Sequence, residues 1–263
     1  MNFSKESIKT VQIPNLTVII PAYNEENRIS SVLDELSDYI SSNNMPWNII
    51  VSIDGNDNTE NIVKNYIAKY NFISYNKKEG RNGKGQSIKR AVPFAIGEFT
   101  MLMDADGSIK LSEIIKNLHY LSNYDAIIFN RYSDPENNIP ILRRIASRGF
   151  NIIVRSFLGI KIRDTQCGYK IIRTNIMKEV FEKIAISNAF FDVSLIYYII
   201  KMKGKMIEVS IKYKYDPNSK FSLVSLILGQ GISLIAFRVR HSRFYKYVPK
   251  IIEELYYKKF RWI

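Results

Sequence analysis

The first half of the chain alternates continuous apolar runs with segments in which apolar residues recur every three or four positions. The runs predict buried strands, and the recurring positions predict amphipathic helices between them. The expected strands are residues 16–20, 48–53, 72–75, 99–103 and 126–129, the first of them ending at Pro21. This alternation is typical of an α/β fold in which a mostly parallel, Rossmann-like sheet is flanked by helices.

Three polar clusters directly follow predicted strands: Tyr23-Asn24-Glu25, Asp54-Gly55-Asn56 and Asp104-Ala105-Asp106. Ligands of open α/β sheets bind beyond the carboxyl ends of the strands. We therefore expect the three clusters to meet at one edge of the sheet and to form a binding site there.

Asp104 and Asp106 are two positions apart, so in an extended chain their carboxylates point to the same side. Two carboxylates in this arrangement repel each other unless a cation lies between them. Hard oxygen ligands select Mg²⁺ or Mn²⁺, which would neutralise charge on a departing diphosphate. The sequence Gly83-Lys84-Gly85 predicts a helix start that favours an anion, with a solvated lysine as the alternative.

The second half contains a helical pattern over residues 139–160. Its polar stripe consists of Arg144, Arg148, Asn151 and Arg155, and the apolar residues Leu142, Ile145, Ile152 and Ile153 lie largely away from that stripe. Two interpretations are open: a basic helix resting on an anionic surface, or a solvated helix packed on the core. Residues 221–237 carry no charge, but serines, glycines and a glutamine interrupt them, which favours a buried or interfacial helix over a spanning one.

Composition limits the partners and the compartment. The chain has 263 residues, 46% of them hydrophobic, which suits one α/β domain with an appendage. Its 38 Lys and Arg residues against 25 Asp and Glu residues give a net charge of +13, which implies an anionic partner. The single cysteine, Cys167, excludes an internal disulfide and is expected to pack in the core of a protein in a reducing compartment. The first 15 residues lack the apolar stretch of a signal peptide.

Taken in order, these clusters resemble family 2 glycosyltransferases with the GT-A fold. Residues 143–151 and 163–170, Phe191-Asp192 and Asn218-Ser219-Lys220 resemble the branch of dolichyl-phosphate glucosyltransferases and dolichyl-phosphate mannose synthases. The likeness runs from about Thr17 to Arg243. Its most specific part is residues 164–170, Asp-Thr-Gln-Cys-Gly-Tyr-Lys.

The resemblance implies a role for individual residues. The nucleotide-sugar site would comprise Pro21, Ala22, Tyr23, Glu25, Asp54, Lys84, Asp104, Ala105, Asp106, Ser219 and Lys220. Within it, Asp104 and Asp106 would hold the metal, and Ser219 and Lys220 would belong to a loop that closes over the donor. The catalytic and acceptor residues would be Asp192, Arg131, Arg143, Arg144 and Ser147. Asp192 would take the place of the acceptor-activating carboxylate, and Arg131, Arg143 and Ser147 match positions that hold the lipid phosphate.

The chain departs from the family pattern at two places. Ile53 and Asn56 flank Asp54-Gly55 where the family usually has aspartate and serine, so base or ribose recognition is expected to differ. Ser108 occupies the position where mannose synthases have a glutamine that can complete the metal shell. This substitution favours the glucosyltransferase-like branch, or a water molecule as ligand.

The resulting prediction is an inverting, metal-dependent hexosyltransferase. It would move glucose or mannose from a UDP- or GDP-sugar to a polyprenyl or dolichyl phosphate, as a peripheral protein on the cytoplasmic membrane face. Residues 1–215 would form the GT-A catalytic domain, and residues 216–263 would form C-terminal amphipathic helices that associate with the membrane.

Other functions remain open at this point. A family 2 transferase with a saccharide or other soluble acceptor is the first alternative. A non-enzymatic module that binds anionic surfaces is the second, and a nucleic-acid partner is not expected because acidic clusters lie where a basic groove should be. A sugar nucleotidyltransferase would need a glycine-rich loop after the first strand, where Tyr23-Asn24-Glu25 lies instead.

Overall fold

The computed structural model describes residues 14–184, 190–215, 223–242 and Tyr245. Among these residues, seven strands form one sheet in the order β3-β2-β1-β4-β6-β5-β7. The strands are β1 (Leu16–Tyr23), β2 (Trp47–Asp54), β3 (Ile73–Lys78), β4 (Phe99–Leu102), β5 (Ala126–Asn130), β6 (Lys170–Arg173) and β7 (Met206–Ser210). Only β6 runs antiparallel to its neighbours in this sheet. The predicted α/β fold with a mostly parallel sheet is therefore confirmed.

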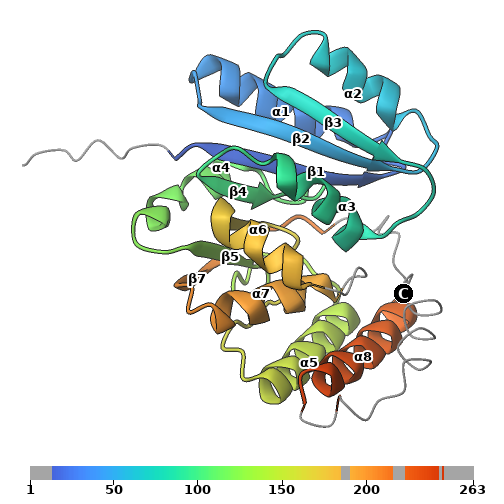
Figure 1. Cartoon of the computed structure of the whole chain (residues 1–263), viewed down its shortest axis with the longest axis vertical. Coiled ribbons are helices and arrows are strands. Elements are labelled where there is room, and N and C mark those ends of the chain that lie inside the picture. Colours follow the sequence, from blue (N-terminus) through green and yellow to red (C-terminus); the bar gives the residue numbers. More distant parts are fainter. Residues whose placement is uncertain (1–13, 185–189, 216–222, 243–244, 246–263) are drawn as a thin grey trace, which may run out of the picture.

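The described helices are α1 (Ile29–Ser42), α2 (Thr59–Ile67), α3 (Lys84–Ala91), α4 (Leu111–Ile115), α5 (Ile141–Leu158), α6 (Thr174–Lys183), α7 (Phe191–Lys201) and α8 (Leu223–Arg240), with two 3-10 turns, η1 (Val92–Phe94) and η2 (Leu118–Ser122). Alternating residues of β1 fill two apolar layers: Val18 packs with α1, whereas Ile19 packs with α3. Figure 1 accordingly shows α1 and α2 on one side of the sheet and α3, α6 and α7 on the other.

The expected end of the first strand was wrong. The first strand continues through Pro21 to Tyr23 rather than ending at the proline. Since β4 pairs with β1 only as far as Ile19, Pro21 has a strand neighbour on one side alone, where a missing N–H is tolerated.

Helix α5 exposes several apolar side chains and buries a polar one. Its apolar residues Ile141, Leu142 and Ile145 are 73%, 73% and 63% exposed, whereas Asn151 is buried. Neither interpretation of the residue 139–160 pattern foresaw these outward-facing apolar side chains, although Phe150 and Val154 of the same helix are buried. A helical structure is confirmed for most of residues 221–237, which belong to α8. Helix α8 lies beside α5 (Figure 1).

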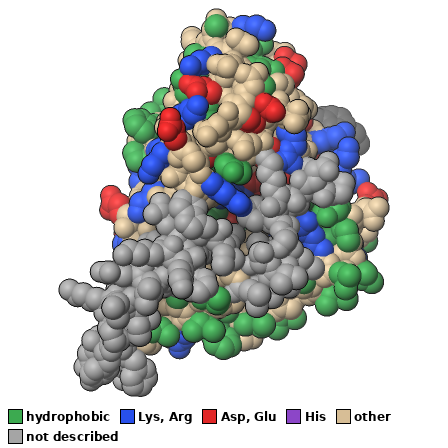
Figure 2. Space-filling model, turned by 90° about the vertical axis from the view of Figure 1, so that its right-hand side faces the viewer, with side chains coloured by type: hydrophobic (Ala, Val, Ile, Leu, Met, Phe, Trp, Pro, Cys, Tyr) green, Lys and Arg blue, Asp and Glu red, His purple; other side chains and the backbone are tan. Residues whose placement is uncertain are grey.

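The end of the molecule formed by α5 and α8 exposes apolar surface. On α8, Ile235 is 62% exposed, and further exposed side chains are Ile232 and Val239. Figure 2 shows hydrophobic side chains along the lower end of the molecule, where Figure 1 places these two helices. Within the described residues, no helix is both long enough and apolar enough to cross a membrane. The domain boundary at residues 215 and 216 stays a prediction.

Candidate functional site

The Asp104-Ala105-Asp106 motif lies directly after β4, at the carboxyl end of the parallel strands. The backbone turns here instead of extending, so the reason given for a shared direction of the two carboxylates was wrong. The two carboxylates nevertheless sense each other: burial and the charge of Asp104 raise the pKa of Asp106. Burial also acts to raise the pKa of Asp104, but the charges of Lys84, Arg131 and Lys170 outweigh it and lower that pKa.

Lys84 begins helix α3 and forms an ion pair with Asp104 through Nζ and Oδ1. Burial acts to lower the pKa of Lys84, but the charges of Asp104, Asp192 and Asp106 outweigh it and raise that pKa. Gly83 caps the helix at φ 87°, a conformation that glycine adopts without strain. The predicted helix start beside the acidic motif is therefore present.

The oxygen atoms at this motif fit a hard divalent cation. Asp104 and Asp106 offer carboxylates, and within the described residues no third His, Cys, Asp or Glu joins them. The Ser108 hydroxyl, two residues further on, is enclosed and acts on the side chains of Asp106 and Tyr213, so it is a further oxygen beside the motif. A set of few protein ligands is what Mg²⁺ or Mn²⁺ requires when phosphate oxygens are to occupy the remaining positions.

The other residues predicted for the donor surround the ends of β1 and β2. Arg81 lies over the Tyr23 ring at 5.3 Å, and the Glu25 carboxylate accepts two hydrogen bonds from Arg28, at 2.7 and 2.8 Å. Asp54 is buried, and its two oxygens accept hydrogen bonds from Arg90 and from the backbone of Asn82. Asp54 therefore fixes the loop before α3, and its contact with a nucleotide stays a prediction.

The segment of residues 164–170 packs against the metal motif. Gly168 touches Asp104 so closely that a Cβ atom built on it would lie 1.8 Å from Oδ2. The Tyr169 hydroxyl donates to the backbone oxygen of Asp104 at 3.3 Å. The most specific part of the family resemblance is thus placed directly against the predicted metal ligand.

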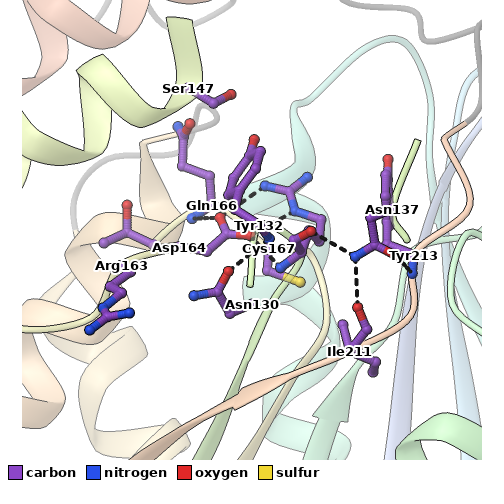
Figure 3. A network of polar contacts seen from close by, with 12 residues as sticks. Asn130, Tyr132, Asn137, Ser147, Arg163, Asp164, Gln166, Cys167, Ile211 and Tyr213 are labelled. Atoms are coloured by element: carbon purple, nitrogen blue, oxygen red, sulfur yellow. Dashed lines mark hydrogen bonds and ion pairs between the residues drawn. The ribbon is translucent and has the colours of Figure 1, made fainter. Parts of the chain in front are cut away.

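The same segment holds Arg131. Asp164 accepts from Nε and Nη2 of Arg131 at 2.8 and 3.0 Å, and from its backbone N–H at 3.1 Å. The Asp164 side chain is fully buried. The rings of Tyr132 and Tyr213 lie 5.4 and 5.5 Å from the guanidinium carbon. Figure 3 shows Asp164, Tyr132 and Tyr213 in one network of polar contacts. Together these three neighbours orient Arg131.

Helix α5 is tied to this network by its polar side. Asn151 accepts hydrogen bonds from the N–H and the hydroxyl of Thr165, at 3.0 and 2.7 Å. Its amide donates to the backbone oxygen of Ser147 at 2.9 Å. Ser147 lies near Gln166 and Tyr132 in Figure 3.

The arginines at the start of α5 have separate partners. Arg143 donates to the Tyr215 hydroxyl at 3.2 Å, and Arg144 donates to the Asn137 backbone oxygen at 2.8 Å. Arg131 and Ser147 both belong to the surroundings of residues 164–170, whereas Arg144 is engaged in holding the chain before the helix.

Asp192 lies in the first turn of α7, and its carboxylate forms an ion pair with Lys170. Its charge acts on Lys84, so the residues predicted for the acceptor and for the donor belong to one cluster. Sequence reasoning missed Lys170 and Gly168 as individual residues, although both lie in the segment that it singled out. Glu208 on β7 gave no signal, yet its Oε1 accepts from the backbone of Arg163 and Asp164 at 2.8 and 2.9 Å.

Two further predictions can be placed. Cys167 is buried in the core and burial raises its pKa to about 12, so its expected packing role is confirmed. Ser219 and Lys220 lie outside the described residues.

Fold and site together define a glycosyltransferase of the GT-A type. The glucosyl-3-phosphoglycerate synthase of Mycobacterium tuberculosis, solved in complex with UDP, has a similar fold: the TM-score is 0.66 and the identity 16%, over 86% of this chain and 80% of that one. Residues 17–181 match the family described as glycosyl transferase family 2, and the chain belongs to that family.

Within the family, the chain is similar to dolichyl-phosphate beta-glucosyltransferases. It is 30% identical over 261 residues to the dolichyl-phosphate beta-glucosyltransferase of Drosophila melanogaster, and the aligned region covers 89% of this chain and 80% of the relative. It is 28% identical over 243 residues to the enzyme of the same description from Dictyostelium discoideum, and the aligned region covers 86% of this chain and 74% of the relative. The predicted family resemblance is confirmed.

Proposed function

We propose that the chain transfers glucose from a nucleotide sugar to a polyprenyl or dolichyl phosphate, with inversion at the anomeric carbon. The observation that carries this proposal is the segment of residues 164–170, which contacts Asp104, Arg131 and Asp192 at once. The similar enzymes described as dolichyl-phosphate beta-glucosyltransferases support the same acceptor and sugar.

A divalent metal, Mg²⁺ or Mn²⁺, would be held by Asp104 and Asp106, and when bound it would neutralise the negative charge of the leaving diphosphate. One Mycobacterium tuberculosis glucosyl-3-phosphoglycerate synthase complex of similar fold contains both Mn²⁺ and UDP. Lys84 would then interact with the diphosphate from the start of α3.

The acceptor phosphate brings its own nucleophile. A phosphate monoester has a second pKa of about 6, so it is largely dianionic at neutral pH and needs no strong general base. The obstacle is the repulsion between two anionic substrates. Arg131 and Arg143 would screen the acceptor phosphate, since a guanidinium fork binds two oxygens at once. Asp192 would orient the acceptor.

We also propose peripheral contact of α5 and α8 with the cytoplasmic face of a membrane. The exposed apolar side chains of α5 support this contact, because a helix that presents apolar side chains outward can enter the interface between headgroups and acyl chains. Its polar side then points toward the predicted phosphate-binding residues. A lipid acceptor could keep its chain in the bilayer while its phosphate reaches Ser147.

The test is transfer of radiolabelled glucose from UDP-glucose to a polyprenyl phosphate in the presence of Mn²⁺, followed by solvent extraction. We expect label in the organic phase with the wild-type chain and none with Asp104→Asn. Label that stays in water as a glycoside of an added saccharide would favour the soluble-acceptor alternative. Label in neither product would contradict the proposed function.

A second test separates the acceptor from the donor. Arg143→Ala should raise the KM for the polyprenyl phosphate by about tenfold, the value of one lost charge-assisted hydrogen bond. Hydrolysis of the donor in the absence of acceptor should stay unchanged. An unchanged acceptor KM and rate would remove Arg143 from the phosphate site.

A further inference from the structure

Lys170 is a fully buried cation in the middle of the sheet. It begins β6, the antiparallel strand, and lies opposite Leu102 of β4 and Ile128 of β5. Its side chain has no exposed surface. Removing an ammonium group from water is costly unless the group is paired and hydrogen-bonded, so its partners must compensate for that loss.

Its partners are a backbone oxygen and the predicted acceptor carboxylate. Nζ of Lys170 donates to the backbone oxygen of Cys167 and to Oδ1 of Asp192. Asp192 lies in the first turn of α7, where the helix dipole favours a carboxylate. Asp192 thus has one carboxylate oxygen held by a buried cation, and its backbone is held in a helix.

Within the described part of the chain, the second carboxylate oxygen of Asp192, Oδ2, remains for a ligand. Among the described residues, Oδ2 has no hydrogen-bond partner. Unlike the buried polar atoms without a partner, Oδ2 is not fully enclosed. The side chain retains 6% of its surface exposed. Charge effects connect this pair to the donor motif: Asp192 stabilises the charged form of Lys84, and Lys170 stabilises that of Asp104.

We propose that Lys170 is a positioning residue, which clamps Oδ1 of Asp192 so that Oδ2 meets the acceptor. This inference rests on the proposed function, in which Asp192 orients the acceptor. A purely structural role for Lys170 would stabilise the sheet without affecting the turnover of folded protein.

A double-mutant cycle separates the two roles. Lys170→Met, Asp192→Asn and the double variant are assayed for kcat and acceptor KM with farnesyl phosphate, at a temperature well below the melting point of each. We expect Asp192→Asn and Lys170→Met each to lower kcat by about 100-fold, within the range of a lost acid–base or orienting group. In the double variant kcat should lie within about threefold of that of Asp192→Asn alone, because Lys170 acts only through Asp192.

Melting temperatures provide the second readout. Lys170→Met should melt about 10 °C lower because it leaves a buried carboxylate without its cation, and the double variant should recover most of this loss. The matched control is the surface pair of α6, Lys183 and Glu179. Lys183→Met should leave both kcat and the melting temperature essentially unchanged.

Several outcomes would overturn the inference. One is a kcat for Lys170→Met equal to that of the wild type. Another is that Lys170→Met lowers kcat by the same factor in the wild type and in the Asp192→Asn variant. If Lys170→Met does not fold, comparison of the double variant with Asp192→Asn still decides: equal kcat supports the clamp and a further loss contradicts it. Failure of the folded wild type to form lipid-linked product overturns the proposed function, whereas an active wild type with an equally active Lys170→Met overturns the clamp alone.

Discussion

The contact between Gly168 and Asp104 gives the sharpest prediction about the metal motif. A Cβ atom on Gly168 would lie 1.8 Å from Oδ2, 2.4 Å from Cγ and 2.6 Å from Oδ1 of Asp104. Ordinary van der Waals contact begins at 3.4 Å, so the carboxylate would have to move by about 1.6 Å. It cannot do so freely, because Oδ1 is paired with Lys84.

We therefore expect Gly168→Ala to lower turnover by about 100-fold, the usual effect of misplacing a functional group by about 1 Å. Stability should fall by about 1–3 kcal/mol, as in other overpacked sites. The assay combines transfer of labelled glucose with the rise in melting temperature caused by Mn²⁺ and UDP. The variant should lose most of that rise, since ligand stabilisation depends on affinity.

The matched control is Gly149→Ala on α5, where an added Cβ atom meets nothing within 4 Å. This variant should keep its activity and gain about 0.5–1 kcal/mol, because alanine favours a helix more than glycine does. Turnover of Gly168→Ala within threefold of the wild type, with an unchanged response to Mn²⁺ and UDP, would refute the assignment of Asp104.

Three further outcomes follow from the site. Asp164→Asn removes the anionic partner of Arg131 and should lower the free energy of unfolding, measured by urea denaturation, by about 3 kcal/mol. An unchanged midpoint of the urea denaturation curve would contradict the importance of this pair. Asp104→Asn should lose at least about 100-fold in turnover while its circular dichroism spectrum stays native, and near-full turnover would remove it from the metal site. Burial raises the pKa of Cys167 to about 12, so the thiol stays protonated at pH 8. Iodoacetamide should therefore modify the folded chain at least about 100-fold more slowly than the unfolded chain. Equal rates would show that the thiol is accessible.

The first half of the fold was predictable because its signals are local. Apolar runs such as that of β1 are buried on both sides of the sheet, and each run predicts a strand without knowledge of its neighbours. The polar clusters after β1, β2 and β4 could be placed together because parallel strands share their carboxyl ends.

The second half resisted prediction because its signals depend on distant residues. The short strand β6 contains Lys170, whose charge argues against a central strand until Asp192 is known to pair with it. The apolar residues of α5 predicted its helical structure, but the outward orientation of Ile145 depends on which side Asn151 uses to bind Thr165. Glu208 carries no local pattern at all, since its role arises from a loop more than forty residues earlier in the chain.

Residues 164–170 have a consequence for how the two substrates are recognised. This one segment contacts the predicted metal ligand Asp104, the predicted acceptor arginine Arg131 and the predicted acceptor carboxylate Asp192. A substrate that orders this stretch lowers the entropic cost for the other, so donor and acceptor should bind with positive cooperativity. By thermodynamic reciprocity, UDP must raise the affinity for a polyprenyl phosphate by the same factor as the phosphate raises the affinity for UDP.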